Sequence, residues 1–191
     1  MYILGGISMK KISILFLLIA IFSLMLLTGC IETKATFTFH DDGTYDSKVT
    51  FRANKIMAGD ELTFLGWQIE YIFPYLMTKY EHTIQTTKID YSDYLEHIFT
   101  ANGLDIETFN SQPNYWFTKK SDGTYAFEST IPQLIDEISE ELKDNKVIEI
   151  EVVMPAPIDM ANTTSVVDNK ATWVLTQADF TRENKLKIIT N

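Results

Sequence analysis

The sequence contains one cysteine and few residues with a positive charge. A single cysteine excludes an internal disulfide framework and any zinc or iron–sulfur site built from several thiolates. The 16 Lys and Arg residues stand against 26 Asp and Glu residues, which gives a formal net charge of −10 at pH 7. We therefore expect no nucleic-acid partner, because no basic surplus is available to neutralise phosphates.

The chain also lacks the common catalytic motifs. It has no G-x-S-x-G nucleophile elbow, no P-loop and no G-x-G-x-x-G dinucleotide fingerprint. The acidic residues around Asp42 do not follow the alternating ligand pattern of an EF-hand loop. No H-E-x-x-H or H-x-H pattern is present either, so surface or turn-capping roles are expected for His40, His82 and His97. We expect no catalytic residues, no metal site and no cofactor.

The chain begins with the layout of a secretory signal peptide. Lys10 and Lys11 precede an apolar run from Ile12 to Leu27 that only two serines interrupt. As a helix, these 16 residues would measure about 24 Å, whereas the hydrocarbon core of a bilayer is roughly 30 Å thick. A permanent membrane-spanning helix is therefore less well supported than a cleaved signal. Met9 is a better translation start than Met1, because both lysines then follow the initiator directly.

The apolar run ends in Leu27-Thr28-Gly29-Cys30, which resembles the lipobox of prokaryotic lipoproteins. A thiol is a suitable nucleophile for accepting a diacylglyceryl group. The small Thr28 and Gly29 suit signal-peptidase recognition, and Leu27 is the branched apolar residue three positions before Cys30. The resemblance implies that residues 1–29 are removed and that acyl chains on Cys30 hold the protein in the cell membrane. The alternative is an uncleaved anchor with an unmodified cysteine.

Either alternative places the remaining chain on the extracytoplasmic face of the membrane. We expect residues 30–191 to form a single domain. Cleavage before Cys30 would remove two lysines and no acidic residue, which leaves 14 basic against 26 acidic residues and a net charge of −12. Anionic headgroups would repel so acidic a body. We therefore expect the domain to stand off the membrane on its anchor.

Three hairpins are predicted from turn residues between runs of β-branched and aromatic residues. Their paired strands are 33–39 with 44–53, 114–120 with 124–131, and 165–167 with 171–175. Further strands are expected at 83–89, 146–154 and 185–190. The first two hairpins share the four-residue sequence Asp-Gly-Thr-Tyr. A duplicated hairpin would explain it, but we favour the simpler interpretation that both turns need the same residues.

Three segments have helical signals. Residues 61–80 are apolar at helical spacing up to Pro74, which should end or kink a helix. Residues 92–101 begin with a possible Ser92 N-cap, and Gly103 suits the left-handed position that follows a helix. Thr130-Ile131-Pro132-Gln133 is a possible capping box for a helix to about residue 144. We predict an α+β fold in which an antiparallel β-sheet built from hairpins packs against two or three helices. Residues 104–113 support no prediction.

The stretch 61–80 is also the candidate binding segment. It is rich in aromatic residues, and it either forms plain core or lines an apolar cavity or patch that accepts an acyl chain or a partner protein. Under the second interpretation, the contacts with a hydrophobic ligand would come from Trp67, Tyr71, Phe73, Tyr75 and Met77.

The C-terminal third shows a recognisable arrangement. A strand ends in Met154-Pro155, Ala161-Asn162 follows, and the next hairpin carries Trp173 on its second strand. Together with the early Asp-Gly hairpin, this resembles the LppM-type domain of prokaryotic envelope lipoproteins over roughly residues 32–54 and 146–190, although Ala156 follows the Met-Pro pair where that domain would have glycine. The resemblance implies an envelope lipoprotein that binds lipids or glycolipids, and it carries over no catalytic residue.

We therefore predict a non-enzymatic, lipid-anchored envelope protein that binds a hydrophobic or lipid ligand or an envelope partner protein. One alternative is a structural or assembly lipoprotein without a ligand pocket. A further alternative is an envelope hydrolase, which would need polar groups with shifted pKa values converging in a cleft.

Overall fold

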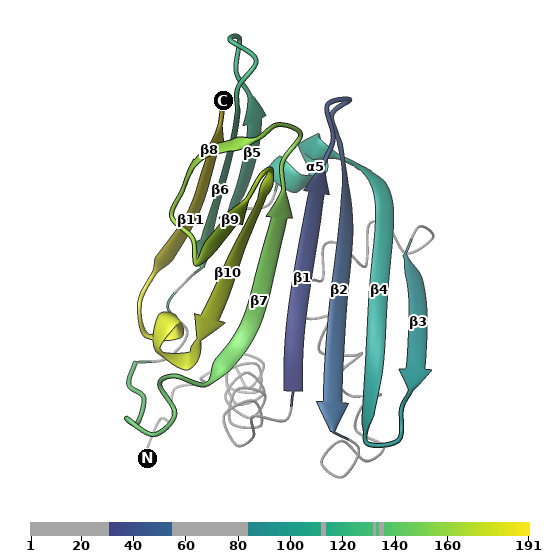
Figure 1. Cartoon of the computed structure of the whole chain (residues 1–191), viewed down its shortest axis with the longest axis vertical. Coiled ribbons are helices and arrows are strands. Elements are labelled where there is room, and N and C mark those ends of the chain that lie inside the picture. Colours follow the sequence, from purple (N-terminus) through teal and green to yellow (C-terminus); the bar gives the residue numbers. More distant parts are fainter. Residues whose placement is uncertain (1–30, 55–83, 112–113, 132, 134–135) are drawn as a thin grey trace, which may run out of the picture.

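The computed structural model describes residues 31–54, 84–111, 114–131, 133 and 136–191. Within them the chain forms a seven-stranded sheet, here sheet A, and a four-stranded sheet, here sheet B (Figure 1). The same residues contain a short helix, α5 (Ile106–Asn110), and a 3-10 turn, η2 (Gln177–Thr181).

Sheet A has the strand order β3-β4-β2-β1-β7-β10-β9. Its neighbours are antiparallel except for β1 and β7, which run parallel. Its strands are β1 (Ile31–Phe39), β2 (Thr44–Asn54), β3 (Gln85–Asp90), β4 (Tyr94–Asp105), β7 (Lys146–Val153), β9 (Ser165–Val167) and β10 (Lys170–Thr176).

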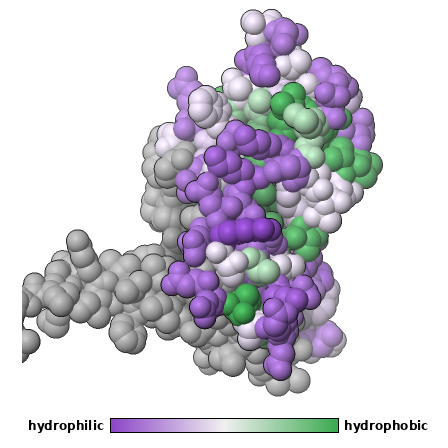
Figure 2. Space-filling view, turned by 90° about the vertical axis from the view of Figure 1, so that its left-hand side faces the viewer, coloured by the Kyte–Doolittle hydropathy of each residue, from purple (hydrophilic) through white to green (hydrophobic). Residues whose placement is uncertain are grey.

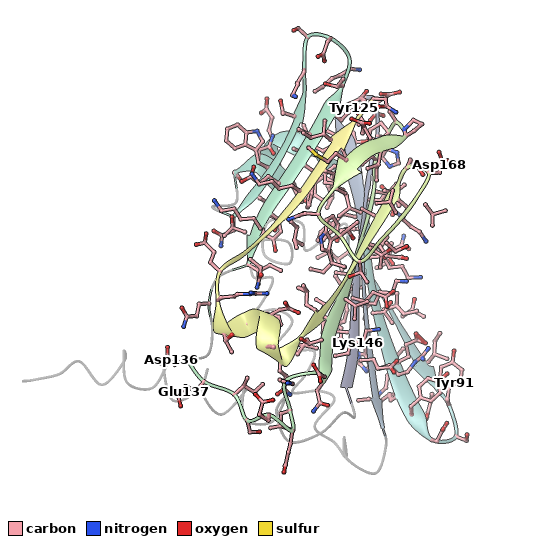
Figure 3. All side chains as sticks on the ribbon, turned by 60° about the vertical axis from the view of Figure 1, so that its left-hand side comes forward. Tyr91, Tyr125, Asp136, Glu137, Lys146 and Asp168 are labelled. Atoms are coloured by element: carbon pink, nitrogen blue, oxygen red, sulfur yellow. The ribbon has the colours of Figure 1, made fainter. Side chains whose placement is uncertain are left out.

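Sheet B is antiparallel and has the order β5-β6-β11-β8. Its strands are β5 (Tyr115–Lys119), β6 (Tyr125–Ile131), β8 (Ile158–Ala161) and β11 (Asn184–Thr190). Figure 3 shows the two sheets as separate layers. The chain passes from β7 in sheet A to β8 in sheet B and returns to sheet A at β9.

Aromatic side chains fill the space between the sheets. Phe39, the last residue of β1, stacks on Phe117 of β5 with ring centroids 4.2 Å apart, and its ring centroid lies 5.8 Å from that of Phe127 in β6. Phe109 of α5 meets Phe39 edge-on at 5.0 Å. These rings are almost fully buried. Burying each ring contributes about 1.5–3 kcal/mol to folding. Packing of this cluster is therefore a main contribution to the contact between the two sheets.

The two Asp-Gly hairpins close with the same contacts. Asp42 accepts hydrogen bonds from the Thr44 backbone N–H and hydroxyl at 3.0 and 2.7 Å, and Asp122 does the same for Thr124. The glycine of each turn has a positive φ, 85° in the first and 89° in the second. All three predicted hairpins and the strands near 83–89, 146–154 and 185–190 are confirmed. The same Asp–Thr hydrogen bonds in both turns account for the repeated Asp-Gly-Thr-Tyr sequence.

The predicted fold class is wrong, because the described chain is mostly β-structure with one short helix rather than a sheet packed on two or three helices. Residues 92–101 belong to β4, where Leu95, Phe99 and Ala101 are buried on one face. Pairing with β2 on one side and β3 on the other outweighs the local helical signal. Gly103 does have a positive φ of 65°, but it lies in a bulge of β4 opposite Asp46.

The helix predicted to follow Thr130 is also not formed over the described residues 136–145, which adopt turns. Two carbonyls of this stretch accept hydrogen bonds from η2: Asn145 from Gln177 N–H, and Lys143 from Ala178 N–H. The stretch thus bonds to the β10–β11 connection. Its own backbone hydrogen bonds, from Leu142 N–H to Ser139 C=O and from Asn145 N–H to Leu142 C=O, span three residues, as in turns, and not four, as in an α-helix. The helix expected in 61–80 lies outside the described residues.

Candidate functional site

The predicted functional residues lie outside the described part of the chain. This applies to the lipobox, Leu27, Thr28, Gly29 and Cys30, and to the proposed ligand contacts, Trp67, Tyr71, Phe73, Tyr75 and Met77. The structure does show that β1 begins at Ile31, directly after Cys30. Both predictions stay predictions.

A shallow hollow of about 580 Å³ lies instead on the outer face of sheet B. We call it the outer groove. Side chains along each strand alternate between the buried and the outer face, and the outer ones line the groove. In β6, for example, Tyr125, Phe127 and Ser129 are buried, while Ala126 and Glu128 face outward. The side chains that face outward and line it come from all four strands and the residue after β8: Trp116, Thr118, Ala126, Glu128, Lys187, Ile189, Met160 and Asn162.

One row across the groove is mainly apolar. Strand register places Thr118 opposite Ala126, Ala126 opposite Ile189, and Ile189 opposite Met160. Ala126 has the smallest side chain of the row, so it forms the low point. Trp116 is 65% exposed and Met160 is 60% exposed. Such large apolar side chains around a depression are typical of a surface that meets an apolar partner.

The next row borders the groove on one side and combines Trp116 with a charged pair. Trp116 lies opposite Glu128, and Glu128 lies opposite Lys187. The Lys187 ammonium is 3.2 Å from the Glu128 carboxylate. Both side chains are about half exposed, so the pair contributes about 0–1 kcal/mol to stability. The groove therefore offers a ligand an apolar track with charged groups along one border.

The strand that carries Trp116 is held at its outer edge. The Asn110 side chain of α5 accepts a hydrogen bond from Phe117 N–H at 2.7 Å and donates one to Phe117 C=O at 2.8 Å. An amide side chain thus takes the place of another strand. This arrangement fixes Trp116 at one side of the groove on rigid backbone and covers part of the sheet edge.

The opposite side of the groove depends on Asn162, the residue after β8. Its side chain accepts a hydrogen bond from Lys187 N–H at 2.6 Å and donates one to Lys185 C=O at 2.5 Å, both on β11. Its backbone carbonyl accepts the indole N–H of Trp173 at 2.6 Å. Trp173 is buried. Asn162 thereby ties β8, with Met160, to both sheets.

Figure 2 shows the side of the molecule on which β8 and β9 lie. Apolar residues gather in its upper part, and hydrophilic residues dominate the rest. Met160 of β8 and Val166 and Val167 of β9 are among the exposed large apolar residues. Exposed apolar surface is thus concentrated at one end of the molecule on this side.

The outer face of sheet A is charged instead. The Lys34 ammonium lies 3.0 Å from Glu149 and 2.9 Å from Glu151, and Lys170 lies 3.1 Å from Glu151. Hydrogen bonds from Lys146 and then Lys34 lower the pKa of Glu149. Burial acts to raise the pKa of Glu151, but hydrogen bonds from Lys34 and Lys170 outweigh it, and this pKa is lowered too. These pairs form a cross-strand ladder that stabilises the sheet.

Two of the three histidines lie in the described residues. The His40 ring lies beside the first turn, as predicted, with Nε2 3.1 Å from the Asp46 carboxylate. His97 is half-buried on β4, and burial and the charge of Lys88 lower the pKa of its imidazole. The surface or capping role predicted for His97 stays a prediction. His82 lies outside the described residues.

The described residues contain no group of three or more His, Cys, Asp or Glu side chains placed to hold a metal ion. In that same part of the chain, no helix has the length and apolar character needed to cross a bilayer.

The groove was not predicted from the sequence. A signal was present, because Trp116 stands between Tyr115 and Phe117 in a predicted strand and must face away from them. The position of Met160 could not be predicted, because β8 was not recognised and its pairing with β11 joins distant segments.

No family model matches the chain, and no curated protein matches it. A search of solved structures finds the folded domain of the LppM protein of Mycobacterium tuberculosis, determined by NMR, with a TM-score of 0.52. The match has 11% sequence identity and covers 85% of this chain and 90% of that chain. The two proteins share a fold, which agrees with the resemblance seen in the residues.

Proposed function

We propose that this protein is a lipid-anchored, extracytoplasmic protein of the cell envelope that binds an apolar ligand of the acyl-chain class in its outer groove. The observation that carries the binding proposal is the exposure of Trp116 and Met160 beside the low point at Ala126. Leaving this surface in water is unfavourable, and an acyl chain laid along it would bury it. No polar side chain has to be desolvated on the row from Ala126 to Met160.

The anchoring proposal depends on the lipobox at Leu27–Cys30 and on the fold shared with the LppM domain. Since β1 starts one residue after Cys30, an acyl group on that cysteine would sit directly at the base of sheet A. The proposed activity is binding without catalysis. An assembly lipoprotein without a ligand remains the alternative, and it predicts an empty groove.

Photolabelling tests the binding site. The full chain, extracted from membranes in detergent, is irradiated with a fatty acid that carries a diazirine in its chain, and labelled peptides are mapped by mass spectrometry. We expect label on β5, β6, β8 and β11. Ala126→Phe fills the low point and should reduce this label at least fivefold. Thr50→Phe adds the same ring to the outer face of sheet A and should leave it unchanged.

Label spread evenly over both sheets, or equal labelling of the Ala126→Phe and wild-type chains, would contradict the proposal. Circular dichroism and thermal unfolding of each variant establish that a lost signal is not lost folding.

A further inference from the structure

The position of the outer groove relative to Cys30 restricts the ligands that can reach it. Cys30 immediately precedes β1, and β1 has nine residues. A strand rises about 3.3 Å per residue, so the two ends of β1 lie about 26 Å apart. An anchor on Cys30 is therefore at one end of sheet A, and the turn that follows Phe39 is at the other.

The groove is level with the far end of β1. Phe39 stacks on Phe117 at 4.2 Å, and Phe117 is paired with Phe127 in sheet B. These two residues alternate along their strands with the groove residues Trp116 and Ala126. The Tyr125 hydroxyl, one residue before Ala126, donates a hydrogen bond to Asp41 in the turn after β1.

The figures show the same arrangement. In Figure 1, β1 starts at the lower end of the molecule, and β5, β6 and β8 lie at the upper end. In Figure 3, Tyr125 is near the upper end, and Lys146 is in the lower half. Lys146 begins β7, which runs parallel to β1, with Ile148 opposite Thr33.

A ligand must therefore cross water to reach the groove if the protein is anchored as proposed. The acyl chains of the anchor lie in the bilayer, about 26 Å from this level by the length of β1. The acidic body would have 14 basic against 26 acidic residues after cleavage, so we expect anionic headgroups to repel it and to disfavour a tilt of its upper end onto them. Lipids in the anchoring bilayer then have no direct contact with Ala126 or Ile189.

Amphiphiles differ in their ability to cross water. A single acyl chain holds a molecule in a membrane only marginally and reversibly, whereas two chains hold it stably. The apolar row also has room for one chain, because it is one residue wide and crosses three inter-strand spacings, about 14 Å, from Thr118 to Met160.

We infer that the outer groove takes single-chain amphiphiles, such as fatty acids and lysophospholipids, and does not take two-chain lipids from the membrane that anchors the protein. This inference rests on the proposed function and narrows its ligand class. It follows from the fold, since the groove and the residue after Cys30 are at opposite ends of β1.

The test uses two photoactivatable lipids that carry the same diazirine acyl chain. One is a lysophosphatidylcholine and the other is a two-chain phosphatidylcholine. The full acylated chain is reconstituted into vesicles of phosphatidylcholine and phosphatidylglycerol, irradiated with either lipid, and mapped by peptide mass spectrometry. A parallel arm uses detergent micelles, in which both lipids have access to all surfaces.

In vesicles, we expect the single-chain lipid to label β5, β6 and β11 at least tenfold more than the two-chain lipid. In detergent, the two should differ by less than threefold. Equal labelling of the groove by both lipids in vesicles overturns the inference and leaves the proposed function standing. If neither lipid labels the groove in detergent, the proposed function itself fails. The wild-type chain carries this comparison, so no variant has to fold.

Discussion

At the scale of single residues, Glu151 is the centre of the ion-pair ladder on sheet A. It lies within 2.9 Å of Lys34 and 3.1 Å of Lys170, and its side chain is only 14% exposed. Removal of one partner would leave a largely buried charge with less compensation. The ladder therefore connects β1, β7 and β10 through groups whose charge depends on pH.

The lowered pKa of Glu151 predicts how stability changes with pH. A carboxyl whose pKa is lower in the folded than in the unfolded state contributes its full stabilisation above the unfolded value, here 4.5, and loses it as pH falls through the folded value. We expect the unfolding temperature of the full chain in detergent to be constant from pH 7 to 6 and to fall below pH 4.5.

Glu151→Gln removes the titrating group. The variant should be less stable than the wild type at pH 7 by about 1 kcal/mol, and the difference should shrink toward pH 3. Differential scanning calorimetry at pH 7, 5 and 3 measures both trends. A difference that grows as the pH falls would show that the ladder does not act as described.

At the scale of secondary-structure elements, the bulge in β4 explains why the left-handed conformation predicted for Gly103 is present although the helix predicted before it is not. Gly103 has a positive φ because β4 has two residues, Asn102 and Gly103, opposite Asp46 of β2. The Asp46 carboxylate accepts the Gly103 N–H at 2.8 Å. Because of the extra residue, Leu104 pairs with Tyr45, and both side chains are buried.

Gly103→Ala should destabilise the protein by about 1 kcal/mol. No atom lies within 4 Å of a side chain added at this position, so the cost comes from the backbone conformation alone. Asn102→Ala is the matched control at the neighbouring exposed position, and we expect a change of less than about 0.5 kcal/mol. Urea unfolding of the full chain compares the two, and equal effects would contradict the role assigned to the bulge.

The hairpins could be predicted because their signals are local. Asp42 and Asp122 make contacts with residues two positions away, so a short window of sequence contains the whole interaction. The identity of β4 depends instead on its pairing with β2, which is distant in the chain, as well as on its pairing with the neighbouring strand β3. The same limit applies to the groove, since no local pattern places Ala126 beside Ile189 or Met160.

At the scale of the whole molecule, the anchor proposal assigns to Cys30 both the attachment of the protein to the membrane and the orientation of its body. The chain has no other cysteine, and the β-structure begins at the next residue. An acyl group on Cys30 would therefore be attached next to the first residue of β1, without a linker between them.

Cys30→Ser should abolish metabolic incorporation of labelled palmitate and leave residues 1–29 attached. Intact-mass measurement of the wild type should give a chain that begins at Cys30 and carries a diacylglyceryl group. Thr28→Ser keeps a small residue beside the cleavage point, and it should be labelled like the wild type. A wild-type chain that retains its first 29 residues and a free thiol would contradict the anchor proposal.

The parallel pairing of β1 with β7 also has a consequence for biosynthesis. Thr36 and Glu151, which face each other in this pair, are 115 residues apart in the chain. At roughly 5–20 residues per second, the ribosome needs about 6–23 s to make that stretch. During this interval the nascent β1–β2 hairpin exposes an unpaired edge, to which aggregating strands or a chaperone can attach. Sheet A can therefore be completed only after β7 has been made. A product truncated before residue 146 lacks β7 and cannot pair the β1 edge with it.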